Sequence, residues 1–172
     1  EDGNDTLTAE DADMDSVRLV LDGGDGQDQL TGSEGGDSLY GGPGNDLLLG
    51  GDGDDRIEAG DGDDTLEGED GDDTLSGEEG DDTIEGNPGD DSLMGGAGND
   101  TLSAGNDNDT LDGGEGDDFL NGQLGNDLLV GQNGADTLVG GSGDDVLDGG
   151  LNDDRLLGND GNDRLRGDDG ND

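Results

Sequence analysis

One Asp recurs every nine residues between Gly23 and Asp172, and its carboxylate can serve as an acid, a base or a cation ligand. The chain has no His and no Cys in its 172 residues, so a Ser-His-Asp triad or a His- or Cys-ligated zinc site is excluded, and no G-x-S-x-G motif occurs. Carboxylate pairs can hydrolyse glycosides, but that chemistry does not explain a long periodic series. We therefore expect cation binding without catalysis, with any catalytic activity in a domain outside this chain.

The period holds through seventeen consecutive repeats, and Leu or Ile stands two residues after the Asp in the first sixteen. Numbered from Gly23, positions 1 and 4 are each Gly in 15 repeats, and position 5 is Asp or Asn in 14. The consensus is G-G-x-G-(D/N)-D-T-L-x. The invariant residues at position 6, all of them predicted metal ligands, are Asp28, Asp37, Asp46, Asp55, Asp64, Asp73, Asp82, Asp91, Asp100, Asp109, Asp118, Asp127, Asp136, Asp145, Asp154, Asp163 and Asp172.

The elements that position these carboxylates follow from the same consensus. Gly, Asn and Asp favour backbone angles that most residues avoid, so positions 1 to 6 are predicted to form a turn. The Thr-Leu-x that follows predicts a short strand, because its side chains alternate between two faces. Position 8 is then buried, and positions 7 and 9 face outward.

Two repeats are needed to enclose a core. Turn, strand, turn and strand make an 18-residue coil, in which each strand stacks on the strand 18 residues away at ~4.8 Å. Residues 23–166 therefore predict eight coils of a parallel two-sheet β-solenoid, filled by Leu and Ile from both sheets. The fold class is all-β.

Stacking brings carboxylates close together in a chain that already carries 51 acidic residues, 5 Arg and a net charge of −46. Asp28 lies above Asp46, and such like charges need a counter-ion. Ca²⁺ fits because it takes oxygen ligands from carboxylates and carbonyls; Mg²⁺ is second choice, and softer metals are disfavoured without His or Cys. Pairing Asp residues 18 apart allows up to about 15 Ca²⁺ ions. Asp28, Asp37, Asp163 and Asp172 have a predicted partner on one side only and should bind most weakly.

The repeat closely resembles the hemolysin-type (RTX) calcium-binding nonapeptide, G-G-x-G-x-D-x-U-x. Gly41-Gly42-Pro43-Gly44-Asn45-Asp46 and Gly95-Gly96-Ala97-Gly98-Asn99-Asp100-Thr101-Leu102 fit it at every defined position. The resemblance implies a right-handed parallel β-roll with each Ca²⁺ held between stacked turns by position-6 Asp side chains and backbone carbonyls. It also implies a module of a secreted or cell-surface protein, unfolded in low-calcium cytoplasm, exported by type I secretion machinery and folded by calcium outside.

Charge and composition exclude other partners. An acidic chain of this kind repels the phosphates of nucleic acid and anionic membranes. No apolar run approaches the ~18 residues of a membrane span. We expect a monomeric module. The alternative function is a structural or adhesive rod that extends a surface adhesin. An ice-binding face would need regular outward Thr ranks, but Phe119 interrupts the rank that contains Thr65, Thr83 and Thr101.

The chain divides at residue 22. Residues 1–22 hold a partial repeat at 3–8, then an acidic insert in which Val17, Leu19 and Leu21 alternate as a strand leading into the roll of residues 23–172. Asp11 to Asp15 resemble the start of an EF-hand loop, but Asp22 stands where an EF-hand has its bidentate Glu. An acidic loop that is not an EF-hand is therefore the better interpretation. Because solenoids need caps and neither end has one, we expect a fragment of a larger protein.

Several positions depart from the consensus. Asp107 and Asn152 replace Gly at position 4, and we expect both to tolerate its backbone angles. Acidic residues at positions 3 and 5 are expected to be solvated and not ligands. Three Arg near the end, Arg155, Arg164 and Arg166, are expected to neutralise nearby carboxylates. The outward apolar residues are expected to be ordinary surface: Tyr40, Leu47, Leu49, Met94, Phe119, Leu128 and Val130.

Overall fold

The fold is a solenoid of two parallel sheets, in a computed structural model that describes residues 3–8 and 18–172. These residues form eighteen strands and no helix. The odd-numbered sheet contains β1 (Thr6–Thr8), β3 (Gln29–Thr31), β5 (Leu47–Asp52), β7 (Thr65–Asp70), β9 (Thr83–Pro88), β11 (Thr101–Asn106), β13 (Phe119–Leu124), β15 (Thr137–Ser142) and β17 (Arg155–Asp160). The even-numbered sheet contains β2 (Val20–Asp22), β4 (Ser38–Pro43), β6 (Arg56–Asp61), β8 (Thr74–Glu79), β10 (Ser92–Ala97), β12 (Thr110–Glu115), β14 (Leu128–Asn133), β16 (Val146–Leu151) and β18 (Arg164–Asp169).

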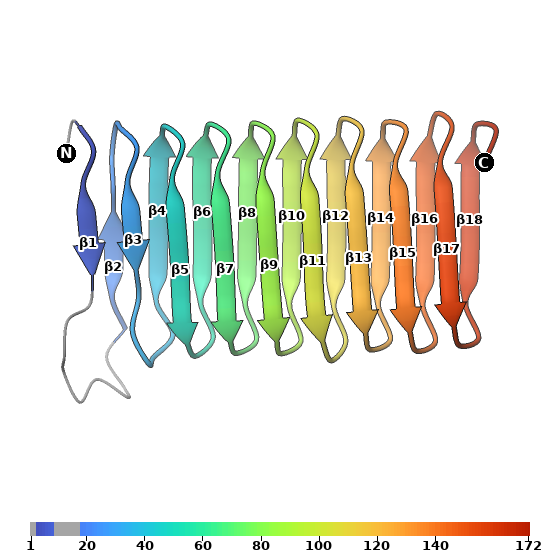
Figure 1. The fold of residues 1–172 in the computed structure, drawn as a ribbon, viewed down its shortest axis with the longest axis horizontal. Helices are drawn as coiled ribbons and strands as arrows, with labels where there is room; N and C mark the ends of the chain where they lie inside the picture. The colour runs from blue at the N-terminus through green and yellow to red at the C-terminus, as the bar shows by residue number, and fades with distance from the viewer. Residues whose placement is uncertain (1–2, 9–17) are drawn as a thin grey trace.

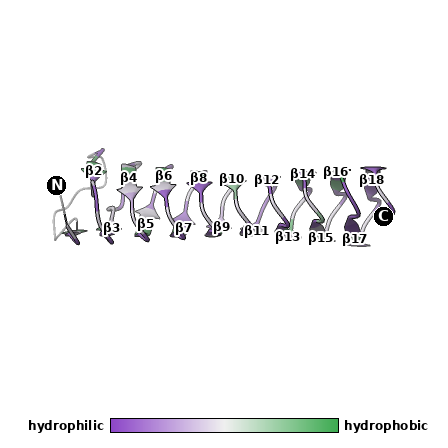
Figure 2. Ribbon diagram, turned by 90° about the horizontal axis from the view of Figure 1, so that it is seen from above, coloured by the Kyte–Doolittle hydropathy of each residue, from purple (hydrophilic) through white to green (hydrophobic). Residues whose placement is uncertain are grey.

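Each strand pairs in parallel with the strand two places along the chain. Leu48 lies beside Leu66 and Leu102 beside Leu120, so the register advances by two nonapeptide repeats in the regular coils. Figure 1 shows the coils following one another along a single axis, and Figure 2 shows the two sheets as two layers. The predicted all-β two-sheet solenoid and its 18-residue coil are confirmed. None of the described residues belongs to a helix that could cross a membrane.

The core consists mainly of the predicted position-8 side chains, but the prediction is wrong for Leu165, which is 48% exposed because β18 is the last strand of its sheet. Fourteen of them are no more than 1% exposed, and each contributes about 1.5–3 kcal/mol by leaving water. Leu7, Leu21 and Leu156 pack against this core near its two ends. The fully buried members are Leu30, Leu39, Leu48, Ile57, Leu66, Leu75, Ile84, Leu93, Leu102, Leu111, Leu120, Leu129, Leu138 and Leu147.

The strands are longer than predicted, and the turns are shorter. From β4 onward each strand has six residues and runs from position 7 through position 3 of the next repeat, which leaves positions 4 to 6 as the turn. The prediction that positions 1 to 3 belong to the turn is wrong, because their backbone groups continue the parallel ladder, as Gly51 does beside Glu69. Position 1 therefore also faces the core, and Ala59 and Ala104 are fully buried there.

A longer coil precedes the regular ones. β1 pairs with β3, with Leu7 beside Leu30, and β2 pairs with β4, with Leu21 beside Leu39. β1 lies within the partial repeat at residues 3–8, and β2 contains Leu21 but not Leu19, which the sequence pattern places in the same strand. They add a ninth coil to the eight predicted. Val17 and the EF-hand-like segment at 11–15 lie outside the described residues.

Candidate metal centres

Successive turns alternate between two edges of the solenoid, as Figure 1 shows. Turns ending at Asp46 and Asp64 lie on one edge, called edge A; those ending at Asp55 and Asp73 lie on the other, called edge B. Edge A carries Asp28, Asp46, Asp64, Asp82, Asp100, Asp118, Asp136, Asp154 and Asp172, and edge B carries Asp37, Asp55, Asp73, Asp91, Asp109, Asp127, Asp145 and Asp163. All seventeen predicted ligands therefore lie in two rows, each with its partner two repeats away.

Each of these seventeen aspartates accepts a hydrogen bond from the preceding coil with one oxygen. The N–H of Asp82 donates to Oδ1 of Asp100 at 2.8 Å, and the N–H of Asp100 donates to Oδ1 of Asp118 at 2.8 Å. On edge B the N–H of Asp73 donates in the same way to Asp91 at 2.8 Å. The carboxylates thus hold the turns together through a chain of charge-assisted hydrogen bonds.

The second carboxylate oxygen has no such partner. In fourteen position-6 residues Oδ2 is buried without a hydrogen bond: Asp28, Asp46, Asp55, Asp64, Asp73, Asp82, Asp91, Asp100, Asp109, Asp118, Asp127, Asp136, Asp145 and Asp154. All of these side chains are at most 6% exposed. A buried unpaired charge is costly. This unpartnered oxygen recurs along both edges and is available to a cation.

Backbone oxygens approach the same place. A Cβ added to Gly41 would collide with Oδ2 of Asp46 and lie 2.5 Å from the carbonyl oxygen of Ala59 in the next coil. Glycine at position 1 therefore leaves room for the carboxylate beside a neighbouring carbonyl. No three carboxylate side chains within residues 3–8 and 18–172 gather closely enough to hold a metal by themselves. A cation bound here would need main-chain carbonyls as further ligands, and such oxygen ligands suit a hard cation such as Ca²⁺.

When no cation is present, the surroundings of the stacked position-6 carboxyl groups oppose their ionisation. Burial raises the pKa of several position-6 carboxyls, and neighbouring carboxylates raise it further, although the backbone hydrogen bond opposes the shift. The pKa reaches about 7 for Asp55, Asp64, Asp73, Asp109 and Asp118. It reaches about 6 for Asp82, Asp91, Asp127 and Asp136. Protons and cations therefore compete for the same oxygens.

Position 5 forms a second ladder that the sequence did not predict. The N–H of Asn99 donates to Oδ1 of Asp81 at 2.7 Å, and the N–H of Asn108 donates to Oδ1 of Asp90 at 2.9 Å. These side chains are exposed, as expected. They nevertheless accept hydrogen bonds from the following coil, whereas position-6 carboxylates accept from the preceding one. The D/N choice at position 5 was the available signal, since both residues offer the same acceptor oxygen.

Asp5 is a position-6 residue that the predicted ligand set omitted. Its N–H donates to Oδ1 of Asp28 at 2.6 Å, and the N–H of Gly3 donates to the carbonyl of Asp25 at 2.6 Å. Asp28 therefore has a neighbouring turn on both sides, and the prediction that it lies at an end of its row is wrong. The signal was present in Gly3-Asn4-Asp5-Thr6-Leu7, but the insert places Asp5 23 residues before Asp28, whereas stacked aspartates of the regular coils are 18 apart.

The departures at position 4 keep a positive φ but change its value. Asp107 has a φ of 76° and Asn152 a φ of 80°, in the left-handed region that Asp and Asn tolerate, whereas the position-4 glycines with a positive φ lie between 113° and 152°. Arg166 pairs with Asp148 at 3.3 Å and with Asp168 at 2.6 Å, which confirms its predicted neutralising role.

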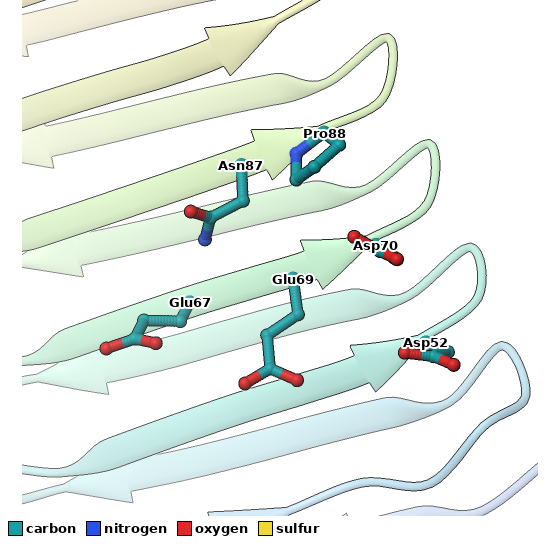
Figure 3. Close-up of a pocket in the computed structure, with 6 residues that line it drawn as sticks. All are labelled: Asp52, Glu67, Glu69, Asp70, Asn87 and Pro88. Carbon is teal, nitrogen blue, oxygen red and sulfur yellow. The ribbon is translucent and has the colours of Figure 1, made fainter.

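An open acidic pocket lies on the outward face of the odd-numbered sheet. Asp52, Glu67, Glu69, Asp70, Asn87 and Pro88 line it, from β5, β7 and β9. Figure 3 shows the four carboxylates spaced apart along this face and not pointing at one centre. None of these four carboxylates has the buried oxygen without a hydrogen bond that occurs along the two edges.

One known protein family has a repeat model that matches this chain. The family model of the RTX calcium-binding nonapeptide repeat (4 copies) matches residues 22–57, 49–84, 85–120, 121–156 and 148–172, which together cover 22–172. No curated protein matches the chain.

Proposed function

The chain belongs to the RTX calcium-binding nonapeptide repeat family, and from this membership we propose that its calcium ions are bound between stacked turns by the position-6 aspartates. Calcium binding in a β-roll is the property of the family. The ligands that we assign are Asp5, at the start of edge A, and the predicted Asp residues other than Asp37. Carbonyl oxygens of the turns complete each site.

The observation that carries this proposal is the set of fourteen buried Oδ2 atoms, on both edges, that have no hydrogen bond. Each belongs to a carboxylate whose other oxygen is already used by a backbone N–H, so the side chain is held in place. A bound Ca²⁺ supplies the positive charge that offsets burial and the repulsion between neighbouring carboxylates. The protein supplies oxygen donors alone, which favours Ca²⁺ over softer metals.

We further propose that calcium binding drives folding. One buried aliphatic side chain every nine residues contributes about 1.5–3 kcal/mol, whereas each ordered residue costs about 1–2 kcal/mol of backbone entropy. The net charge of −46 opposes compaction as well. Binding free energy then becomes folding free energy, as in other proteins whose metal site exists only when folded.

The biological role that we propose is a calcium-dependent module of a secreted or cell-surface protein. Low cytoplasmic calcium would leave it unfolded for passage through type I secretion machinery, and external calcium would fold it. Membership of the RTX family supports this role. We propose that the module is monomeric and that catalytic activity, if the whole protein has any, resides elsewhere.

A rod that extends an adhesin is the second candidate. The uniform two-repeat register from β5 to β18 supports it, because such a stack can hold another domain away from a surface. An ice-binding face has less support, since Phe119 lies between Thr101 and Thr137 in the sheet, and Glu67 lies beside Glu85.

Circular dichroism of the purified chain tests the proposal. We expect a coil spectrum with chelator and a cooperative change to a β spectrum as Ca²⁺ is added to millimolar concentration. Mg²⁺ at the same concentration is the control and should produce a smaller change. Identical spectra with chelator and with Ca²⁺ would refute calcium-driven folding.

A further inference from the structure

The turn at residues 32–37 has a different backbone from the other turns. Position 2 has a positive φ in sixteen of the seventeen repeats, and Ser33 is the exception. Residues other than glycine adopt that conformation at position 2, for example Glu69 at 76° and Gln123 at 72°. The departure at Ser33 is therefore not explained by the mere absence of glycine. The preceding strand β3 is also short and ends at Thr31.

Hydrogen bonds of Ser33 account for the difference. Its N–H and its Oγ both donate to Oδ2 of Asp37, at 2.7 Å and 2.9 Å. The other oxygen, Oδ1, accepts from the N–H of Leu19 at 2.7 Å. Both carboxylate oxygens of Asp37 therefore have protein donors, although this side chain is as buried as its neighbours at 1% exposed. The next carboxylate on edge B, Asp55, has an Oδ2 with no partner.

Among the described residues, only one of the two turns that stack on the Asp37 turn presents a position-6 carboxylate, namely that of Asp55. Leu19 stands 18 residues before Asp37, at the place where an Asp stands in the regular coils, and its N–H alone reaches Asp37. Position 5 of this turn is Gly36, which has no side chain for the second ladder. The Asp37 turn therefore lacks the free buried oxygen of the other turns, and among the described residues it has a position-6 carboxylate in the following turn only.

We propose that the Asp37 turn binds no calcium and is closed by the hydrogen bonds of Ser33. Ser33 is thus a specificity-determining residue: it takes up the oxygen that the other turns leave to the metal. The calcium series on edge B begins with Asp55, and in the folded chain the pairing of β2 with β4 is held at this edge by hydrogen bonds in place of a metal ion. This inference rests on the proposed role of the other position-6 aspartates.

Native mass spectrometry of the full chain, which counts bound ions as integers, tests this inference. Asp37→Asn should keep the calcium count of the unmodified chain, whereas Asp100→Asn, the matched change in a regular turn, should lower it by one or two. Circular dichroism in calcium should show both variants folded. A loss of ions in Asp37→Asn equal to that in Asp100→Asn would overturn the inference. An unchanged count in Asp100→Asn would instead overturn the proposed ligand role itself.

Ser33→Gly provides a second measurement that does not depend on Asp37→Asn folding. This change removes the hydroxyl and lets residue 33 adopt the positive φ of the other position-2 residues, so that its N–H no longer donates to Asp37. Oδ2 of Asp37 should then be free, and the calcium count should rise by one. Ser76→Gly, an outward-face change at position 9, is the control and should leave the count unaltered. No gain of calcium in Ser33→Gly would contradict the role assigned to Ser33.

Discussion

The two edges of the solenoid are built from the same nonapeptide, yet they begin differently. Edge A starts with Asp5, so its first regular turn stacks on another carboxylate turn. Edge B starts with Leu19, and its first carboxylate is fully occupied by protein donors. The comparison shows that a consensus repeat does not define a metal site by itself. The residue at position 2 decides whether the carboxylate keeps an oxygen for a cation, because the N–H of the stacked residue occupies Oδ1 on both edges.

The largest expected effect is that of pH on the stability of the fold, and it should be the same for both edges. Asp64 on edge A and Asp55 on edge B both have a pKa raised to about 7 by burial. The ordinary value of 3.8 applies when the chain is unfolded, so the folded chain holds protons more tightly. Protonation therefore stabilises the calcium-free fold fully below pH ~4, and this stabilisation is lost as the pH rises through about 6–7.

Two results should follow in circular dichroism titrations at constant ionic strength. Without calcium, acidification from pH 7.5 to about 4.5 should increase the β signal. With calcium, the midpoint concentration for folding should rise as pH falls to about 5.5, because protons occupy the ligand oxygens. The same calcium concentration at the folding midpoint at pH 7.5 and at about pH 5.5 would show that the buried carboxyls are not the ligands.

A core substitution should weaken both edges together. Leu102 is fully buried in β11, between a turn of edge A and a turn of edge B. Leu102→Ala should cost about 2–5 kcal/mol of calcium-loaded stability through lost burial and a cavity. Chemical denaturation in excess calcium measures the loss. Thr101→Ala, at the neighbouring outward position, is the control and should change stability by less than about 1 kcal/mol. Equal effects of the two changes would argue against the shared core.

Much of this organisation could be predicted from the sequence, because the period fixes both the coil and the core. Leu30 to Leu147 were assigned to the interior from their spacing alone, and all are buried. The extent of the strands was not predictable from local preference, since Gly at positions 1 and 2 signals a turn while the parallel ladder holds it in a strand. Asp5 was hidden by the change of spacing. The Ser33–Asp37 contact depends on side-chain geometry that no repeat pattern encodes.

Pairs of substitutions should separate the edges. Asp82 and Asp100 are adjacent on edge A and share a hydrogen bond, so Asp82→Ala and Asp100→Ala each damage a site that the other also needs. Their combined effect on calcium count should be smaller than the sum. Asp91 is closer to Asp100 in sequence but lies on edge B, so Asp91→Ala with Asp100→Ala should be additive. Ion counts by native mass spectrometry decide. Additivity in both pairs would contradict stacked sites.

The smallest expected effect concerns position 5, whose ladder needs an acceptor and not a charge. Asp81 accepts from both the N–H and the Nδ2 of Asn99, at 2.7 Å and 3.0 Å, at an exposed position. Asp81→Ala should cost about 0.5–1.5 kcal/mol in calcium, by denaturation. Asp81→Asn keeps the acceptor oxygen, as Asn99 and Asn108 do in this ladder, and should be nearly neutral with an unchanged calcium count. If Asp81→Asn instead loses calcium, position 5 contributes a metal ligand, and the division of labour between the two ladders is wrong.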